Sequence, residues 1–207
     1  MYVPAHFEET DPATLRALLA AHPLATWATV HGGLPVVNHV PMRLDPTRGP
    51  LGTLVGHVAR ANPLWQQPAP SVLVFQGVQA YISPSWYAAK REHGQVVPTW
   101  NYAVVHVHGL PQFVHEREPL RAIVERLTDT HEAGRAAPWQ VADAPADYID
   151  KMLGAIVGVE IPVDRWVGKW KLSQNRSGAD RDGVRAGLAA ELEADARAMA
   201  PQVRPGG

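Results

Sequence analysis

The chain has 207 residues, a hydrophobic content of 46%, a charged content of 19% and a formal net charge of −1 at pH 7. These values are typical of a globular protein with a full core and exclude a disordered chain, and the near-neutral charge gives no electrostatic argument for nucleic-acid binding. Cysteine is absent, which excludes disulfides and thiolate metal sites.

The N-terminal stretch and the apolar runs of the chain bear on where the protein is expected. The N-terminal stretch MYVPAHFEETD has neither a basic start nor an apolar centre, so we expect no secretory signal. No apolar run approaches the ~20 residues needed to span a bilayer. We therefore expect a cytoplasmic protein without a membrane partner. Seven tryptophans are a large number for this length and direct attention to aromatic-lined pockets.

Helix and strand signals follow one another closely along the chain. Thr10-Asp11-Pro12 predicts a helix start, because a capping side chain precedes a proline at the first helical position, and the helix should end at Pro23. Alternating apolar residues and turn residues then predict strands at 24–30, 34–44, 51–57, 71–76, 80–83, 102–108, 155–161 and 166–172. Helices are expected at 58–65, 119–130, 145–153 and 184–199.

Short strands separated by turns, with few helices, favour an antiparallel barrel or sandwich with peripheral helices and a C-terminal helix. The fold class is therefore mainly β with α additions. We find no internal repeat and no low-complexity linker, so we predict a single domain over residues 1–200 and a flexible tail at 201–207.

The stretch from Tyr81 to Gly109 has the highest density of polar-tipped aromatic side chains. Three of them precede a charged loop at 88–94, and Trp100, Asn101 and Tyr102 follow it. A purely structural sheet has little use for so many, because each buried indole or phenol needs a hydrogen-bond partner. We therefore expect a binding site in this stretch.

The segment from Gly56 to Asn62 is a second candidate. A predicted strand ends here and a predicted helix begins, so backbone N–H groups could cradle a phosphate beside His57 and Arg60. Arginine suits bidentate phosphate contacts. The alternative is an ordinary strand-to-helix corner with a solvated arginine.

Three weaker signals remain open. His39 is either a polar ligand contact or a half-exposed strand residue. His106 and His108 lie on one strand face, but no carboxylate accompanies them at a familiar ligand spacing, so we expect no metal. Residues 168–176 combine cations, an indole and two amides. This segment either closes over a flat anionic ligand or forms an edge strand that lysines protect from aggregation.

Several common chemistries lack their motifs. Neither GxGxxG after a strand nor GxxxxGK[ST] is present, which excludes Rossmann and P-loop sites. We find no GxSxG elbow and no helix-turn-helix pair with a basic recognition helix.

Five stretches resemble the motifs of the PaiB-like FMN-binding proteins, a family labelled negative transcriptional regulators. They are Met1-Tyr2-Val3-Pro4, GHVARANPLW (56–65), AYISPSWY (80–87), VPTWNYAVVHVHG (97–109) and GKWKLSQNRSGADRDGV (168–184). They occur in the family's order and span nearly the whole chain. The resemblance implies a split antiparallel β-barrel of the FMN-binding type, shared with pyridoxamine-phosphate oxidase-like flavoproteins. It also implies homodimers with FMN bound in two clefts between the subunits.

The resemblance also implies which residues contact FMN. The corner at 56–62 is similar to the FMN phosphate site of split barrels, and the strand around His39 is similar to the strand along the isoalloxazine ring. Further contacts would come from the same subunit or from its partner. The implied FMN-binding residues are His39, Val40, Pro41, Gly56, His57, Arg60, Asn62, Trp100, Asn101, Lys171, Ser173, Gln174 and Asn175.

The resemblance favours an FMN-linked negative transcriptional regulator that acts as a homodimer, although the neutral charge does not support a DNA partner. An FMN-dependent oxidoreductase that uses a reduced nicotinamide or a small substrate is the alternative, because a fold does not fix a function. No residue is identifiable as its acid or base; His106 or His108 would be the candidates. A third hypothesis is haem binding through an axial histidine, as in other split barrels.

Overall fold

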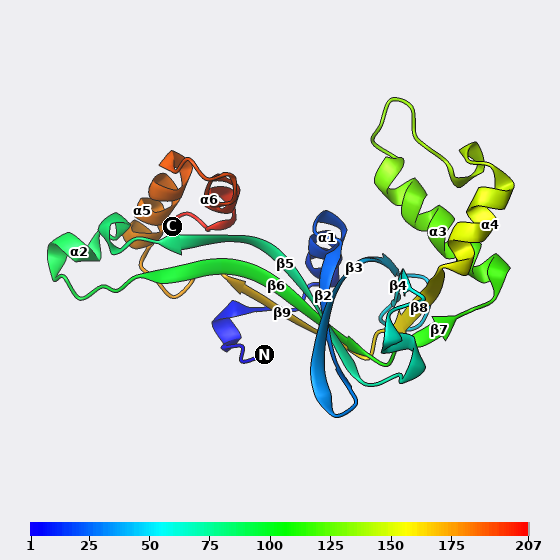
Figure 1. Cartoon of the computed structure of the whole chain (residues 1–207). Coiled ribbons are helices and arrows are strands. Elements are labelled where there is room, and N and C mark those ends of the chain that lie inside the picture. Colours follow the sequence, from blue (N-terminus) through cyan, green and yellow to red (C-terminus); the bar gives the residue numbers. More distant parts are fainter. Residues whose placement is uncertain (207) are drawn as a thin grey trace. The chain divides into compact units, whose positions relative to one another are not determined.

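The computed structural model describes residues 1–206 and contains nine strands with helices between them (Figure 1). The strands are β1 (Glu8–Glu9), β2 (Leu24–His31), β3 (Leu34–Asp45), β4 (Thr53–Ala59), β5 (Ser71–Ile82), β6 (Thr99–Gly109), β7 (Gln112–Val114), β8 (Ile156–Pro162) and β9 (Arg165–Lys171). They pair in the order β1-β9-β6-β5-β2-β3-β4-β8-β7. The predicted class, mainly β with α additions, is confirmed.

The α-helices are α1 (Pro12–Ala21), α2 (Ala89–Glu92), α3 (Arg117–Glu132), α4 (Ala146–Gly154), α5 (Gly178–Ala190) and α6 (Ala194–Met199). Short 3-10 helices lie at Ala5–Phe7, Pro63–Gln66, Pro84–Trp86, Val141–Asp143 and Ala200–Gln202. None of the helices among residues 1–206 has the length and apolarity to cross a membrane.

The chain forms two compact units, and each unit draws on separate segments of the sequence. Unit 1 comprises Met1–Leu18, Gln76–Val105 and the chain from Val167 onward, and unit 2 comprises Leu19–Phe75 and His106–Trp166. Strands β5, β6 and β9 contribute residues to both units. The single domain predicted over residues 1–200 stays a prediction.

Unit 2 is built on a tight antiparallel hairpin. Strands β2 and β3 are joined at Gly32 and Gly33, whose φ angles of 58° and 79° suit a two-residue hairpin turn. Strand β3 continues into pairing with β4, and β4 pairs with β8. Helix α3 buries its apolar stripe against these strands, with Ile123 and Leu127 packed on Val55. This packing fixes the position of α3 over β4.

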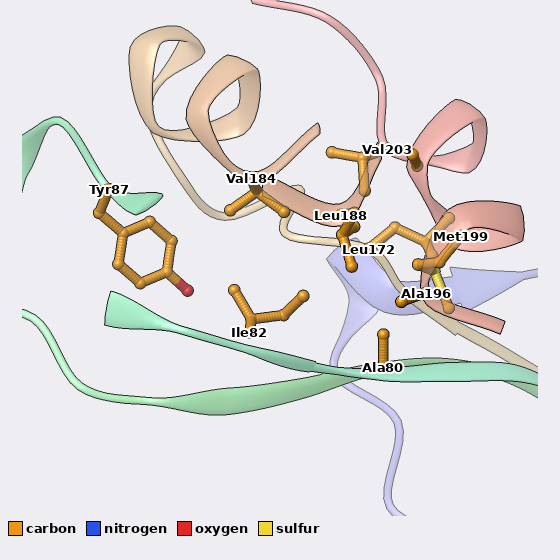
Figure 2. Close-up of a cluster of buried hydrophobic side chains, with 10 residues drawn as sticks. Ala80, Ile82, Tyr87, Leu172, Val184, Leu188, Ala196, Met199 and Val203 are labelled. Carbon is orange, nitrogen blue, oxygen red and sulfur yellow. The ribbon is translucent and has the colours of Figure 1, made fainter. Parts of the chain in front are cut away.

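Unit 1 carries its own core between β5 and the C-terminal helices (Figure 2). Ala80 and Ile82 of β5 point toward α5 and α6, as Figure 2 shows, and meet Leu188 and Met199. The whole cluster consists of Ala80, Ile82, Tyr87, Leu172, Val184, Leu188, Ala196, Met199, Ala200 and Val203. One face of this part of the sheet is therefore covered by helices.

Four local expectations differ from the structure. The strands predicted at 71–76 and 80–83 are one continuous strand, β5. The helix predicted from Val58 is wrong, because β4 continues to Ala59 and only Pro63–Gln66 are helical. The single helix predicted at 184–199 ends at Ala190 and restarts at Ala194. The two short strands β1 and β7 were not expected.

The C-terminal residues make contacts within unit 1, and the flexible tail expected at 201–207 stays a prediction. Val203 is fully buried in the cluster of unit 1. Arg181 donates hydrogen bonds from its guanidinium to the carbonyl oxygens of Arg204 and Pro205, at 3.2 and 3.1 Å. Residues 201–206 are thus held on α5 by packing and by charge-assisted hydrogen bonds. Gly207 lies outside the described residues.

Candidate functional site

Strand β3 presents two of its three predicted flavin contacts to solvent. His39 lies opposite Thr26 and Pro41 lies opposite Leu24 in the β2–β3 ladder, and both His39 and Pro41 are exposed. Val40 points the other way and is only 5% exposed, as the alternation of a strand requires. Only the side chains of His39 and Pro41 are therefore free to contact a ligand here.

Gly56 and His57 lie inside a central strand and not at a helix start. Gly56 pairs with Met42 of β3 and with Val159 of β8, so β4 has a hydrogen-bonded neighbour on each side. A Cβ atom at Gly56 would lie 2.9 Å from the carbonyl oxygen of Pro41. The glycine thus permits close packing of β3 on β4.

The polar groups after β4 are also engaged within unit 2. Arg60 donates from Nε to the carbonyl oxygen of Gly154 and from Nη2 to that of Ile156, each at 2.8 Å. Its backbone N–H donates to the carbonyl oxygen of Ala155. Arg60 therefore ties the end of α4 to β4. The phosphate site expected at this corner has no helix start, and several of its expected hydrogen-bond donors are already bonded to carbonyl oxygens of the protein.

Asn62 has a similar structural role. Its Oδ1 accepts a hydrogen bond from the backbone of Leu64 at 3.1 Å, which caps the 3-10 helix at Pro63–Gln66. Its Nδ2 donates to Oδ1 of Asn38 at 2.8 Å. The FMN contacts implied for His39, Val40, Pro41, Gly56, His57, Arg60 and Asn62 stay predictions.

A cleft of about 340 Å³ lies beside two of these residues, Pro41 and His57. Its other walls come from α3 and the loop after it, and they are Leu127, Thr128, His131, Glu132 and Trp139. Burial lowers the pKa of His57, so the imidazole that faces this cleft is neutral at pH 7. No motif in the sequence indicates this wall of the cleft, because α3 reaches β3 and β4 only through tertiary packing.

In unit 1, Asn101 and Ser173 bind each other. Asn101 is fully buried and Ser173 is 4% exposed, and the Asn101 Nδ2 donates to the Ser173 Oγ at 3.0 Å. Ser173 has a φ of 64°, the one positive value at a non-glycine residue among residues 1–206. The side chain of Gln174 accepts from the backbone of Leu172 and donates to the carbonyl of Trp170. These contacts shape the turn after β9.

Trp100 and Lys171 lie on the opposite side of the strands from α5 and α6. Trp100 is 53% exposed and meets Tyr81 edge to face, with 6.1 Å between the ring centroids. Lys171 donates from Nζ to Thr99 Oγ1 and to the carbonyl oxygen of Trp100. Because Lys171 precedes the core residue Leu172, it faces away from the helices. Asn175 is exposed in the following turn.

Lys169 joins this group, although it was not among the implied FMN-binding residues. It lies two residues before Lys171 on β9, and its Nζ is 5.3 Å from the ring centroid of Tyr102. We call Tyr81, Trp100, Tyr102, Lys169 and Lys171 the aromatic–lysine cluster. Burial lowers the pKa of Lys171, and the neighbouring Lys169 and Arg176 lower it further.

A second cleft in unit 1, of about 790 Å³, lies between β1, β9 and the C-terminal segment. Gln174 is the one predicted residue that lines it, and both ends of its amide are already bonded to backbone. Carboxylates of Glu8 and Glu9 and guanidinium groups of Arg181 and Arg204 line the same cleft. Its walls therefore mix both signs of charge.

Strand β6 carries His106 and His108, and the guanidinium of Arg165 lies beside His108. The Nη2 of Arg165 lies 3.2 Å from Nε2 of His108. Burial, followed by Arg165, lowers the pKa of His108, and burial lowers the pKa of His106. No group of three or more histidine, aspartate or glutamate side chains that could hold a metal ion occurs within residues 1–206.

Comparison with known proteins agrees with the motifs. A family model described as "Putative FMN-binding domain" matches residues 1–165. The Bacillus subtilis protein named protease synthase and sporulation protein PAI 2 is 32% identical over 203 residues, which cover 97% of this chain and 95% of that protein. An uncharacterised protein of Emericella nidulans is 32% identical over 226 residues, covering 91% of this chain and 90% of that protein.

Solved structures with the same fold have low sequence identity. The FAD and heme binding protein from Mycobacterium smegmatis has a TM-score of 0.61 at 20% identity, covering 79% of this chain and 73% of that one. The flavocytochrome Anf3 from Azotobacter vinelandii has a TM-score of 0.58 at 17% identity, covering 82% and 72%. The predicted split β-barrel of the flavin-binding type is confirmed. The chain therefore belongs to the PaiB-like family of FMN-binding domains.

Proposed function

We propose that this chain holds FMN against the aromatic–lysine cluster of unit 1 and acts as a homodimeric, flavin-linked negative transcriptional regulator. The observation that carries the flavin site is the exposed Trp100–Tyr81 pair next to the desolvated ammonium of Lys171. A flat aromatic ligand with a phosphate needs an aromatic wall and a cation near its anionic end. The buried Asn101–Ser173 pair holds the two strands that carry these groups.

Membership of the family supports FMN as the cofactor. FMN would supply reversible electron transfer when bound. The residues of this chain would bind and orient the cofactor. Trp100 and Tyr81 form an apolar wall, and Lys171 places a positive charge at the end of β9. The regulator role is supported by the 32% identity to a protein whose name links it with protease synthesis and sporulation.

One exposed apolar face of the β2–β3 hairpin supports the proposal of a homodimer. Leu24, Val30 and Val37 are 58%, 49% and 56% exposed, and the ladder pairs place them on the same face. The neighbouring residues of that face, Pro35 and Pro41, are also exposed. Contiguous apolar surface of this kind marks interaction sites. A homodimer that covers this face would remove it from water.

The first test is the absorbance spectrum of the purified protein, with the released chromophore identified by mass. Bands near ~375 and ~450 nm and the mass of FMN are expected. A single band near ~400 nm would instead indicate haem, and a colourless protein that takes up no added FMN would refute the flavin site. Light scattering should give twice the mass of one chain.

The regulator role needs a separate test, because flavin binding alone does not distinguish it from an enzyme. Retention of the gene's own upstream DNA, selective for sequence and weakened by salt, is expected for a regulator. Rapid oxidation of a reduced nicotinamide by the flavin-loaded protein, with no selective DNA retention at low salt, would refute this role and leave the flavin site intact.

A further inference from the structure

The cleft of about 790 Å³ in unit 1 lies on one face of β9. Trp170 of β9 and Leu172 directly after it line this cleft, and residues two apart on a strand share a face. Leu172 also belongs to the core cluster that β5 forms with α5 and α6 (Figure 2). Lys169 and Lys171 alternate with these two residues, so they point to the other face. The cleft is therefore separate from the aromatic–lysine cluster.

Glu9 of β1 places a negative charge on this face. It lies opposite Gly168 in the β1–β9 ladder, and residues directly opposite in an antiparallel pair point to the same face. Gly168 and Trp170 are two residues apart on β9, so the carboxylate of Glu9 is on the face that carries Trp170. Its Oε1 accepts a hydrogen bond from the backbone N–H of Asp11 at 2.8 Å. This bond holds the half-buried carboxylate in place and does not neutralise its charge.

Two arginines of the C-terminal part supply positive charge to the same cleft. The guanidinium of Arg181 in α5 donates to three carbonyl oxygens, those of Arg176, Arg204 and Pro205, at 3.1, 3.2 and 3.1 Å. These bonds fix the guanidinium and leave two of its five N–H donors for a ligand. Carbonyl oxygens carry no net charge, so the positive charge of Arg181 is not neutralised. Arg204 is exposed and also lines the cleft.

The opposite charges that line the cleft do not pair with one another. Within residues 1–206, no ion pair joins Glu9 to a basic side chain, and none joins Arg181 or Arg204 to an acidic one. Glu9 and Arg181 are each held by hydrogen bonds to the backbone, which keep the two groups apart. The cleft therefore has a fixed negative charge on one wall and a fixed positive charge on another.

A ligand that contacts both walls must carry both signs of charge. The carboxylate of Glu9 disfavours a polyanion such as a nucleotide, and the two guanidinium groups disfavour a polycation such as a polyamine. The volume of about 790 Å³ lies in the upper half of the range of roughly 300–1,000 Å³ for small-molecule sites, so a single amino acid would leave much of it unfilled. Trp170 and Leu172 add an apolar wall that suits a hydrophobic side chain.

We propose that this cleft binds short peptides, of about two to four residues, whose two ends are free. The ammonium group of the peptide donates to Glu9, and its carboxylate accepts from the unused N–H donors of Arg181 and from Arg204. Capture of a free amine or of a C-terminal carboxylate is a recurrent mode of peptide recognition. The inference goes beyond the proposed flavin-linked function and does not depend on it.

The test is isothermal titration calorimetry of the purified protein with the tripeptide alanyl-leucyl-alanine and with its blocked forms. Acetylation removes the charge of the ammonium group, and amidation removes that of the carboxylate. Each block should weaken binding by about 3- to 30-fold, less than the full value of a buried charged hydrogen bond, because Arg204 is exposed and Glu9 is half-buried. Free leucine should bind at least about tenfold more weakly than the tripeptide, because it leaves part of the cleft unfilled.

Two variants assign each end of the peptide to its wall. Glu9→Gln keeps an oxygen for the N–H of Asp11 and removes the charge, so it should weaken binding of the free tripeptide and leave that of the acetylated form within about twofold. Arg204→Gln should weaken binding of the free tripeptide in the same way and spare the amidated form. Arg91→Gln and Glu92→Gln, in the exposed α2, change the net charge equally and should leave every affinity unchanged.

Three results would overturn the inference. The first is the absence of binding at millimolar tripeptide, both by calorimetry and by a rise in melting temperature. The second is equal affinity for the free and the doubly blocked tripeptides, which would mean that the ends are not recognised. The third is equal affinity for free leucine, which would exclude peptides as the ligand class. All three are measured on the wild-type protein, so the inference can be refuted even if a variant fails to fold.

Discussion

Ser173 allows the energy of one buried contact to be separated from the strain of its backbone. Its hydroxyl accepts a 3.0 Å hydrogen bond from Asn101, which has no exposed surface. Ser173→Ala leaves the Asn101 amide without this partner, so it should cost about 1–3 kcal/mol of unfolding free energy. The left-handed φ of 64° is unfavourable for any residue with a Cβ. Ser173→Gly loses the same bond but relieves this strain, so it should be about 1 kcal/mol more stable than Ser173→Ala.

Urea unfolding of Ser173→Ala and Ser173→Gly measures the free energy of the lost hydrogen bond and that of the backbone strain. The double variant Asn101→Ala with Ser173→Ala completes a thermodynamic cycle, and a coupling of about 1 kcal/mol or more is expected for residues in direct contact. Ser85→Ala is the control, because Ser85 is exposed and should change stability by less than about 0.5 kcal/mol. Two results would refute the reasoning: a Ser173→Ala variant as stable as the wild-type protein, or a glycine variant no more stable than the alanine variant.

Two further perturbations test the packing and the titration of the fold. Leu188→Ala removes a fully buried side chain of α5 and should lower the free energy of unfolding in urea by about 2–5 kcal/mol. Leu192→Ala, at a side chain 90% exposed, should lower it by less than about 0.5 kcal/mol. Equal costs would contradict the buried cluster. Burial lowers the pKa of His57 in the folded state, so the unfolded chain binds the proton more tightly and stability falls as the pH drops below about 6.5. His57→Gln should lose less stability than the wild-type protein over this range, and parallel pH profiles would show that His57 is not desolvated.

The sequence predicts elements well where the signal is local. The Asp11-Pro12 start of α1 and the glycine pair between β2 and β3 are set by capping and by positive φ, which neighbouring residues decide. Val58 shows where prediction from local sequence fails. Its neighbours permit a helix, but pairing between β4 and β8 keeps it in a strand. The break between α5 and α6 is instead held by a local contact, because Arg197 of α6 donates to the carbonyls of Glu191 and Leu192, six and five residues earlier, which the interrupted helix leaves free.

The same contrast between local and tertiary signals applies to the residues of the candidate site. Trp100 and Lys171 could be identified from motifs, since aromatic and cationic residues mark such sites in a linear sequence. The partner of Asn101 could not, because Ser173 is 72 residues away in the chain and meets it only through strand packing. Lys169 lay in the candidate segment 168–176 but was not assigned as a contact, because an alternating lysine on a strand is indistinguishable from a solvated one until its burial is known.

The composition of unit 1 has a consequence for how the chain folds during synthesis. Its core needs Ala80 and Ile82 from the middle of the chain and Val203 from near the end. Contacts that join such distant residues form slowly, because a long loop must close before they contribute. Until residues 178–203 have been synthesised, the apolar side of β5 lacks the full cover that α5 and α6 provide. During that time the nascent chain is exposed to aggregation, and chaperones should protect it.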